Sequence, residues 1–289
     1  MNHIEIKGIS VYYEDYRPEE YEDTVVLLHG FLSSTFSFRR LIPYFQNHYR
    51  VIAIDLPPFG KSAKNLSFPY SYKNLGDIVV ELLQQLNIQE AHFMGHSMGG
   101  QIALNVMNNH SGIAKKGVLL CSSGYLKPAH LLLKGVSRLP YFHHYIKVWL
   151  TRSGILRNIE NVVHNTAIIS DEMILGYVRP FLEEDIFKAL SQMIRHREGD
   201  LPSTTLQSIQ TPILLLWGEQ DKVVPLSVGE RLVKDLPNAN LHVLKNTGHL
   251  IPEERPEETF TYVHSYLSSE TVVKQEKNII PFTPTFDTI

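Results

Sequence analysis

The chain has 289 residues, which is enough for one large α/β domain or for one domain that carries an insertion. Its formal net charge is −3 and we expect no basic patch, so the composition gives nucleic-acid binding no electrostatic support. A single cysteine, Cys121, excludes a disulfide framework within the chain, and no stretch approaches the roughly 18 apolar residues that span a bilayer.

The chain begins with two strand-like segments, 3–7 and 9–14, which we expect to form a hairpin around Gly8. Because this end lacks an apolar signal core, the sequence predicts a cytoplasmic protein. Short, mostly apolar runs follow, and such runs are typical of strands buried on both faces of a parallel sheet. They lie at 24–28, 51–54, 91–94, 117–121, 213–217 and 241–244.

Helical patterns separate these runs. The clearest is 72–87, where apolar residues recur at three- and four-residue steps and form one stripe. Further helices are predicted at 36–45, 98–109, 226–236 and 256–267. Strands that alternate with helices indicate βαβ units, so we predict an α/β fold with a mostly parallel, eight-stranded sheet flanked by helices.

Residues 125–207 interrupt the alternation, because they are helix-like and contain no strand pattern. We therefore predict a helical cap over 125–207, inserted after the sixth strand, where it would lie above the strand ends that bind ligands. The core would consist of 1–124 and 208–269. The tail, 270–289, has mixed charge and no clear period, and we expect it to be disordered or docked on the body.

The segment Gly95-His96-Ser97-Met98-Gly99 matches the pattern Gly-x-Ser-x-Gly and lies between a predicted strand and a predicted helix. Hydrolases expose a nucleophilic serine at such a turn, and the glycines are needed because a Cβ would collide with neighbouring backbone. The segment therefore makes Ser97 the candidate nucleophile.

A serine nucleophile needs a base, and the base needs a carboxylate that fixes its tautomer. Asp221 follows the predicted strand 213–217, and His249 follows the strand 241–244. The order Ser97, Asp221, His249 is a known order for a catalytic triad. Glu219 remains an alternative acid.

Only a few of the 14 histidines lie just beyond a predicted strand. We expect His29 to shape the loop after an early strand, and His96 to point away from its neighbour Ser97. His249 is therefore the candidate base. The second requirement of acyl transfer is an oxyanion hole, for which we predict the backbone N–H groups of Phe31 and Met98.

With these residues the chain resembles the α/β-hydrolase superfamily, and within it the capped, carboxylesterase-like serine hydrolases. The resemblance extends over about 25–267 and implies the triad described above. It rests on His29-Gly30-Phe31, Asp55-Leu56-Pro57-Pro58-Phe59-Gly60-Lys61-Ser62, Gly95-His96-Ser97-Met98-Gly99-Gly100, Trp217-Gly218-Glu219-Gln220-Asp221 and Gly248-His249.

Some positions depart from related patterns. Pro58 replaces a glycine that usually follows Asp55, which predicts a stiffer loop. Capped C–C bond hydrolases resemble the chain as well, but they usually carry a glycine-rich oxyanion loop and an asparagine where His96 stands. The serine at position 97 argues against haloalkane dehalogenases and epoxide hydrolases, which use an aspartate.

We therefore predict a serine hydrolase that cleaves a small-molecule carboxylic ester through an acyl-enzyme, as a monomer or homodimer. The aromatic cap, with residues such as Trp149, suggests an apolar acyl or alcohol part. No cofactor is expected. No metal is expected either, because His143-His144 has no carboxylate or cysteine partner at metal spacing. C–C bond, lactone or thioester hydrolysis, perhydrolysis, and a ligand-sensing role with slow turnover remain open alternatives.

Overall fold

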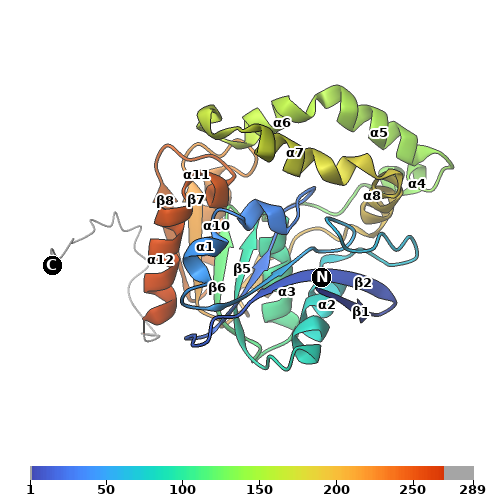
Figure 1. The fold of residues 1–289 in the computed structure, drawn as a ribbon. Coiled ribbons are helices and arrows are strands. Elements are labelled where there is room, and N and C mark those ends of the chain that lie inside the picture. Colours follow the sequence, from blue (N-terminus) through green and yellow to red (C-terminus); the bar gives the residue numbers. More distant parts are fainter. Residues whose placement is uncertain (1, 270–289) are drawn as a thin grey trace.

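The computed structural model describes residues 2–269 of the chain, and eight strands form its central sheet (Figure 1). Their order across the sheet is β1-β2-β4-β3-β5-β6-β7-β8. β1 and β2 form the expected antiparallel hairpin, β2 pairs antiparallel with β4, and the other neighbours are parallel. The strands are β1 (Asn2–Ile6), β2 (Ile9–Tyr16), β3 (Thr24–Leu28), β4 (Arg50–Ile54), β5 (Ala91–His96), β6 (Ala114–Leu120), β7 (Ile213–Gly218) and β8 (Ala239–Leu244).

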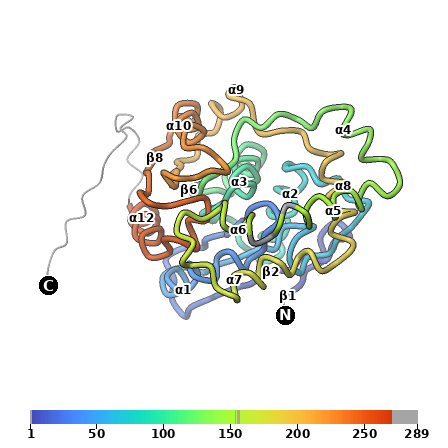
Figure 2. Tube along the Cα trace, turned by 90° about the horizontal axis from the view of Figure 1, so that it is seen from above, coloured from blue at the N-terminus to red at the C-terminus, as the bar shows by residue number. Residues whose placement is uncertain are grey.

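Four of the central strands are buried along their whole length. Every residue of β3, β4, β5 and β7 is buried, as expected for apolar runs that are covered on both faces. One face carries α2 (Tyr72–Gln85), α3 (Met98–Asn109) and α10 (Leu226–Asp235), and the other carries α1 (Ile42–Phe45) and α12 (Pro256–Ser268) (Figure 2). The predicted α/β fold with a mostly parallel, eight-stranded sheet is therefore confirmed.

The prediction of one helix over 36–45 is wrong. The structure has a 3₁₀-helix, η1 (Thr35–Phe38), followed by the separate helix α1, in whose first turn Pro43 lies. Proline lacks an N–H group and its ring clashes with the preceding turn, so it is tolerated at the start of a helix but not in its interior.

Between β6 and β7 the described residues form helices and no strand, and this segment crosses above the sheet (Figure 1). Two of these helices, α5 (Phe142–Ser153) and α8 (Glu184–His196), pack against each other and supply residues to the cavities at Ser97. The elements of the segment between β6 and β7 are α4 (Leu131–Val136), α5 (Phe142–Ser153), α6 (Ile155–Val162), η2 (Thr166–Ile168), α7 (Asp171–Val178), η3 (Arg179–Leu182), α8 (Glu184–His196) and α9 (Ser203–Leu206).

A short helix, α11 (Ile251–Glu254), follows the loop that carries His249. None of the helices within 2–269 has the length and apolar character required to cross a bilayer. The expectation for the tail concerns 270–289, which lie outside the described residues.

Candidate active site

Ser97 occupies the turn between β5 and α3. Its backbone has φ 52° and ψ −117°, a left-handed conformation that is strained for any residue with a side chain. A Cβ at Gly95 would collide with the backbone of Gly99, and a Cβ at Gly99 would collide with the backbone of Leu28. The two glycines therefore permit the close packing that holds this turn against the sheet.

His249 and Asp221 come together from the loops that follow β8 and β7. The Nδ1 atom of His249 lies 2.7 Å from Oδ2 of Asp221, and both side chains are buried. Because an ionised carboxylate can only accept, this contact places the ring proton on Nδ1 and leaves Nε2 to act as a base. Ser97 and His249 line the same cavity, and among the described residues the Ser97 hydroxyl makes no hydrogen bond.

Asp221 is held in its ionised form. Burial raises the pKa of its carboxyl group, but the hydrogen bond and charge of His249 and the N–H groups of Val224 and Val223 outweigh burial, so the net pKa is lowered. The two N–H groups donate to Oδ1 at 2.9 and 2.8 Å. The alternative acid Glu219 instead accepts a hydrogen bond from Gln220, so the geometry favours Asp221.

Two backbone N–H groups near Ser97 have no acceptor within the described part of the chain. They belong to Phe31, in the loop after β3, and to Met98, the first residue of α3. Both residues line one cavity together with Ser97. Free N–H groups at the start of a helix favour a developing negative charge, which is the requirement for an oxyanion hole.

His29 has a structural role, as predicted. Its buried ring accepts the N–H of Leu56 at Nε2 (2.9 Å) and contacts the carbonyl oxygen of Gly30 through Nδ1 (2.7 Å). Burial lowers the pKa of His29, so the ring stays neutral. It therefore joins the loop that holds Phe31 to the loop after β4.

The place of His96 was not foreseen. We expected it to point away from Ser97, but its ring lies 4.8 Å from that of His249 between centroids, and both rings line one cavity. The Nε2 atom of His96 lies 2.9 Å from the carbonyl oxygen of His249. Burial lowers the pKa of His96 to about 3, so this neutral ring supports the histidine loop.

Cys121 is buried behind the Asp221–His249 pair, as a small core residue would be. Its sulfur accepts the N–H of Gly218 at 3.4 Å, and burial raises the pKa of its thiol. The ligand atoms of Cys121, Asp221 and His249 lie close enough to hold an ion. The protonated thiol and the existing carboxylate–imidazole hydrogen bond fit a triad better than a metal centre.

His143 and His144 have no carboxylate or cysteine partner at metal spacing in the sequence, but in the structure a carboxylate from a distant helix lies beside them. Glu184, from α8, approaches both rings, and the ligand atoms of the three residues lie within 4.8 Å of one another. Glu184 is already paired with Lys147. The partner comes from 40 residues away in the chain, so sequence spacing could not reveal it.

Two apolar cavities meet at Ser97. The first has a volume of about 480 Å³, contains the N–H groups of Phe31 and Met98, and extends between α5 and α8; we call it the inner cavity. The second, of about 550 Å³, contains His249 and extends beneath α6 and η3; we call it the histidine cavity. Trp149, Leu150 and Val223 line both.

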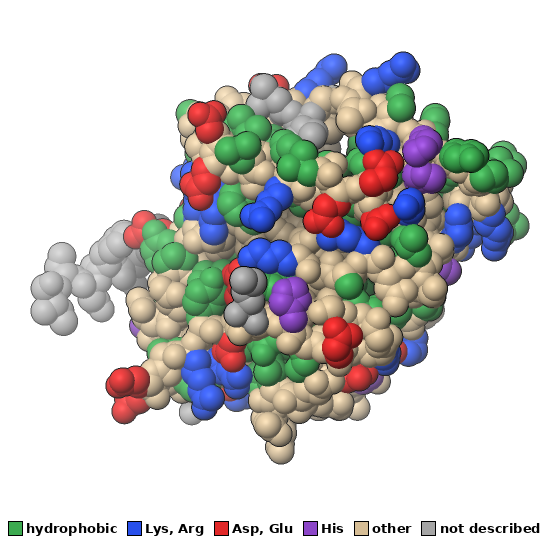
Figure 3. Space-filling model, turned by 45° about the vertical axis from the view of Figure 1, so that its right-hand side comes forward, with side chains coloured by type: hydrophobic (Ala, Val, Ile, Leu, Met, Phe, Trp, Pro, Cys, Tyr) green, Lys and Arg blue, Asp and Glu red, His purple; other side chains and the backbone are tan. Residues whose placement is uncertain are grey.

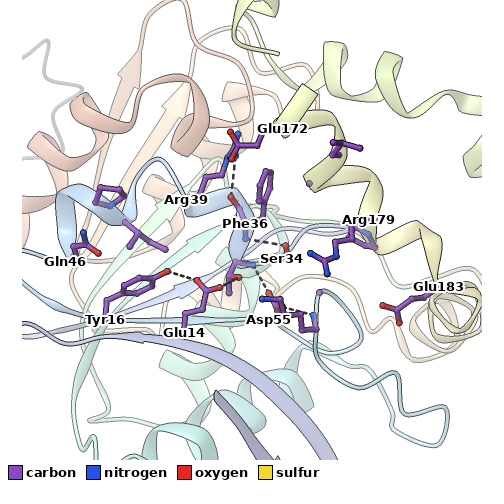
Figure 4. A pocket seen from close by; sticks show the side chains of 18 residues that line it. Glu14, Tyr16, Ser34, Phe36, Arg39, Gln46, Asp55, Glu172, Arg179 and Glu183 are labelled. Carbon is purple, nitrogen blue, oxygen red and sulfur yellow. Dashed lines mark hydrogen bonds and ion pairs between the residues drawn. The ribbon is translucent and has the colours of Figure 1, made fainter. Parts of the chain in front are cut away.

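A larger cavity, of about 610 Å³, lies between β2, η1 and α7, and it contains none of the three candidate catalytic residues (Figure 4). Its polar side chains mostly bond one another: Glu14 accepts hydrogen bonds from Tyr16 and Thr35, and Arg39 pairs with Glu172. The candidate residues Ser97 and His249 line the two apolar cavities instead.

Two glutamates that sequence analysis did not single out as functional join the histidine loop to the helical segment above it. Glu254 accepts the N–H groups of Gly248 (2.9 Å), His164 (2.8 Å) and Asn165 (3.1 Å). Glu253 is fully buried and binds Arg39, Arg40 and the hydroxyl of Tyr177.

Comparisons with known proteins agree with this fold. A model of the alpha/beta hydrolase family matches residues 25–261. The uncharacterized hydrolase YugF of Bacillus subtilis is 50% identical over 252 residues, which cover 87% of this chain and 92% of that protein. A 2-hydroxy-6-oxononadienedioate/2-hydroxy-6-oxononatrienedioate hydrolase of Paraburkholderia phymatum is 30% identical over 82% of this chain and 84% of its own length.

Among solved structures, a meta-cleavage product hydrolase from Pseudomonas fluorescens superposes with a TM-score of 0.76 at 21% identity. The match covers 92% of this chain and 97% of that one. At this level of identity the likeness concerns the fold.

Proposed function

The chain belongs to the alpha/beta hydrolase family, and we propose that it is a serine hydrolase that cleaves carboxylic esters with an apolar acyl or alcohol part. The observation that carries the proposal is the strained Ser97 turn, which shares a cavity with a buried His249–Asp221 pair at 2.7 Å. Two N–H groups that have no acceptor among residues 2–269, those of Phe31 and Met98, border the same serine.

The first half of the reaction transfers the acyl group to the enzyme. Nε2 of His249 takes the Ser97 proton while Oγ bonds the ester carbon, and the carbonyl oxygen becomes an oxyanion that the N–H groups of Phe31 and Met98 stabilise. When the tetrahedral intermediate collapses, the bond to the alkoxy oxygen breaks and His249 protonates that oxygen. The products of this half are the free alcohol and an acyl-Ser97.

The second half releases the acid. His249 deprotonates a water molecule, which attacks the acyl carbon of acyl-Ser97. The second tetrahedral intermediate then expels Oγ, and His249 returns the proton to it. Asp221 remains ionised throughout, holds Nδ1–H of the ring, and stabilises the imidazolium that forms in each half.

Each of the two cavities would bind one part of the ester. The leaving oxygen must receive its proton from His249, so the alcohol part belongs in the histidine cavity, which that residue lines. The acyl part then extends into the inner cavity, among side chains such as Leu190 and Met193. Both cavities have predominantly apolar linings, which favours esters with apolar groups on both sides of the reacting carbonyl.

We propose that residues 125–207 act as a cap on a core made of 1–124 and 208–269. The support is that α5, α6 and α8 supply much of the lining of both cavities. The cytoplasmic location and the oligomeric state, monomer or homodimer, stay predictions, as do the absence of a cofactor and of a catalytic metal.

Hydrolysis of a C–C bond is the second candidate. It is suggested by the 2-hydroxy-6-oxononadienedioate/2-hydroxy-6-oxononatrienedioate hydrolase of Paraburkholderia phymatum, which is 30% identical to this chain. Two local features favour ester cleavage. The oxyanion loop reads Phe31-Leu32-Ser33-Ser34, and the buried residue before the nucleophile is His96.

A panel of chromogenic esters with increasing acyl length tests the proposal. We expect turnover that rises from acetyl to medium-length acyl chains and that is abolished in Ser97→Ala. Faster turnover of small polar esters would contradict the apolar substrate class. Faster turnover of a vinylogous diketone than of any ester would favour the C–C hydrolase, and a single slow acylation would favour a sensor.

A further inference from the structure

We propose that the outer part of the helical segment is a docking surface for anionic lipid bilayers. The surface consists of α4, the outer side of α5 and the chain between and beside them, residues 126–157, and we call it the basic arm. The proposal goes beyond the reaction at Ser97, and its test does not require turnover.

The basic arm is unusually apolar for an exposed surface. Leu131 and Leu132 in α4 have exposed fractions of 82% and 71%, and α4 has no buried residue. Further exposed apolar side chains follow in the connection to α5 and along α5: Leu139, Tyr141, Tyr145, Val148 and Trp149. Contiguous exposed apolar side chains of this kind mark interaction sites in soluble proteins.

The charge of the basic arm favours an anionic partner. The arm carries six basic residues and no acidic one, in a chain whose formal net charge is −3. Only Lys147 among the six forms a salt bridge within the described residues, to Glu184. The six are Lys127, Lys134, Arg138, Lys147, Arg152 and Arg157.

The expectation that the chain has no basic patch is therefore wrong for this region. Figure 3 shows hydrophobic side chains gathered beside Lys and Arg side chains at the outer end of the segment that crosses above the sheet. Apolar side chains that enter the bilayer interface, with cations that reach the headgroups, are the two contributions that bind a protein to an anionic leaflet.

The arm is continuous with the inner cavity. Leu126, Leu133, Tyr145 and Trp149 are exposed and also line that cavity, which leads to Ser97. A bilayer that covers the arm would therefore lie at the cavity mouth. An apolar ester dissolved in the bilayer could enter the cavity without crossing water.

The chain contains a reporter for docking. It has two tryptophans: Trp149 in the arm is 60% exposed, and Trp217 in β7 is fully buried. Insertion of the arm into a bilayer would shift the emission of Trp149 to shorter wavelength and leave Trp217 unchanged.

The test measures co-sedimentation and tryptophan emission with vesicles of phosphatidylcholine alone and of phosphatidylcholine mixed with phosphatidylglycerol. We expect binding and a blue shift with the anionic vesicles, and weakening of both by high salt. In Leu131→Asp/Leu132→Asp, binding should fall at least about tenfold, because two apolar contacts are lost and two negative charges added. Neither leucine lines a cavity at Ser97, so turnover of a water-soluble ester should not change.

The matched control is Leu175→Asp/Leu182→Asp, in α7 and η3, where the side chains are 68% and 76% exposed but the surrounding residues 171–185 carry five acidic side chains and one basic one. This control should keep vesicle binding. Absence of binding by the unmodified protein, or equal loss in both variants, would overturn the proposal. A change from dimer to monomer in the arm variant without vesicle binding would show that a second copy covers the arm. All readings can be repeated in Ser97→Ala, so failure here is distinct from failure of the proposed reaction.

Discussion

The backbone N–H of His249 donates a hydrogen bond to the carbonyl oxygen of Val162, 2.8 Å away. This contact joins the candidate base to the end of α6, in the segment that covers the active site. Glu254 reinforces it, because one carboxylate oxygen binds Gly248 and the other binds His164 and Asn165. The position of the histidine loop is therefore coupled to the position of the segment above it.

Replacement of Glu254 tests this coupling. Glu254→Ala should lower kcat for a good ester about tenfold, because charge-assisted hydrogen bonds that hold the loop are lost. Glu254→Gln should restore part of the rate, since its oxygen can still accept. The exposed Glu257→Ala, in α12, is the matched control and should behave as wild type. If kcat and KM both stay unchanged in Glu254→Ala, the coupling has no part in catalysis.

The choice of the acid is tested by a pair of substitutions. Asp221→Asn should lower kcat by roughly 10⁴, because the amide no longer fixes the base tautomer of His249. Glu219→Gln should leave kcat nearly unchanged, since Glu219 bonds Gln220 instead. Steady-state kinetics of the two variants under the same conditions decide the matter, and the reverse pattern would make Glu219 the acid.

The fold was largely predictable because its signals are local. Each central strand contains a short, mostly apolar run, and all eight strands occur where the sequence indicates them. The error at 36–45 was also local, since Pro43 already marks the start of α1 rather than the interior of a longer helix.

The candidate site was predictable only in part, because its supporting contacts join distant segments. Ser97, Asp221 and His249 each follow a predicted strand, so their common edge of the sheet could be inferred. The contact between Glu254 and His164 spans 90 residues and depends on how the helical segment folds back over the sheet. No periodicity or spacing in the sequence encodes that path.

Acid should destabilise the protein through its buried histidines. Burial lowers the pKa of His96 to about 3 and that of His92 to about 4, whereas the same groups in the unfolded chain take up protons near their ordinary value of 6.5. The unfolded state therefore binds more protons than the folded state below about pH 6.5. The free energy of unfolding decreases as the pH is lowered through that range.

His96→Gln isolates one contribution, because the amide nitrogen of glutamine lies about as far along the side chain as Nε2 of the imidazole and can still donate to the carbonyl oxygen of His249. At about pH 4.5, the neutral His96 should lower the free energy of unfolding by roughly 2–3 kcal/mol relative to neutral pH. Urea unfolding at both pH values measures it. The loss of stability on acidification should be smaller in the variant, and an equal loss would contradict the assignment of a neutral, buried His96.

The assignment of the two cavities can be tested by narrowing each one. Met193→Trp should reduce kcat/KM for esters with long acyl chains and spare those with long alcohol chains, because Met193 lines only the inner cavity. Phe181→Trp, in the histidine cavity, should do the opposite. Kinetics on two series of esters, one varied in the acyl part and one in the alcohol part, provide mutual controls. If Met193→Trp instead impairs esters with long alcohol chains and Phe181→Trp those with long acyl chains, the assignment of the two cavities is reversed.

The central claim is that Ser97 is the nucleophile of an ester hydrolase. Incubation with a fluorophosphonate, followed by digestion and mass spectrometry, tests it most directly. We expect one phosphonyl adduct, on Ser97, with loss of ester turnover in proportion to labelling, and no adduct in Ser97→Ala. An adduct on another residue, or turnover that persists when Ser97 is fully labelled, would show that Ser97 is not the nucleophile.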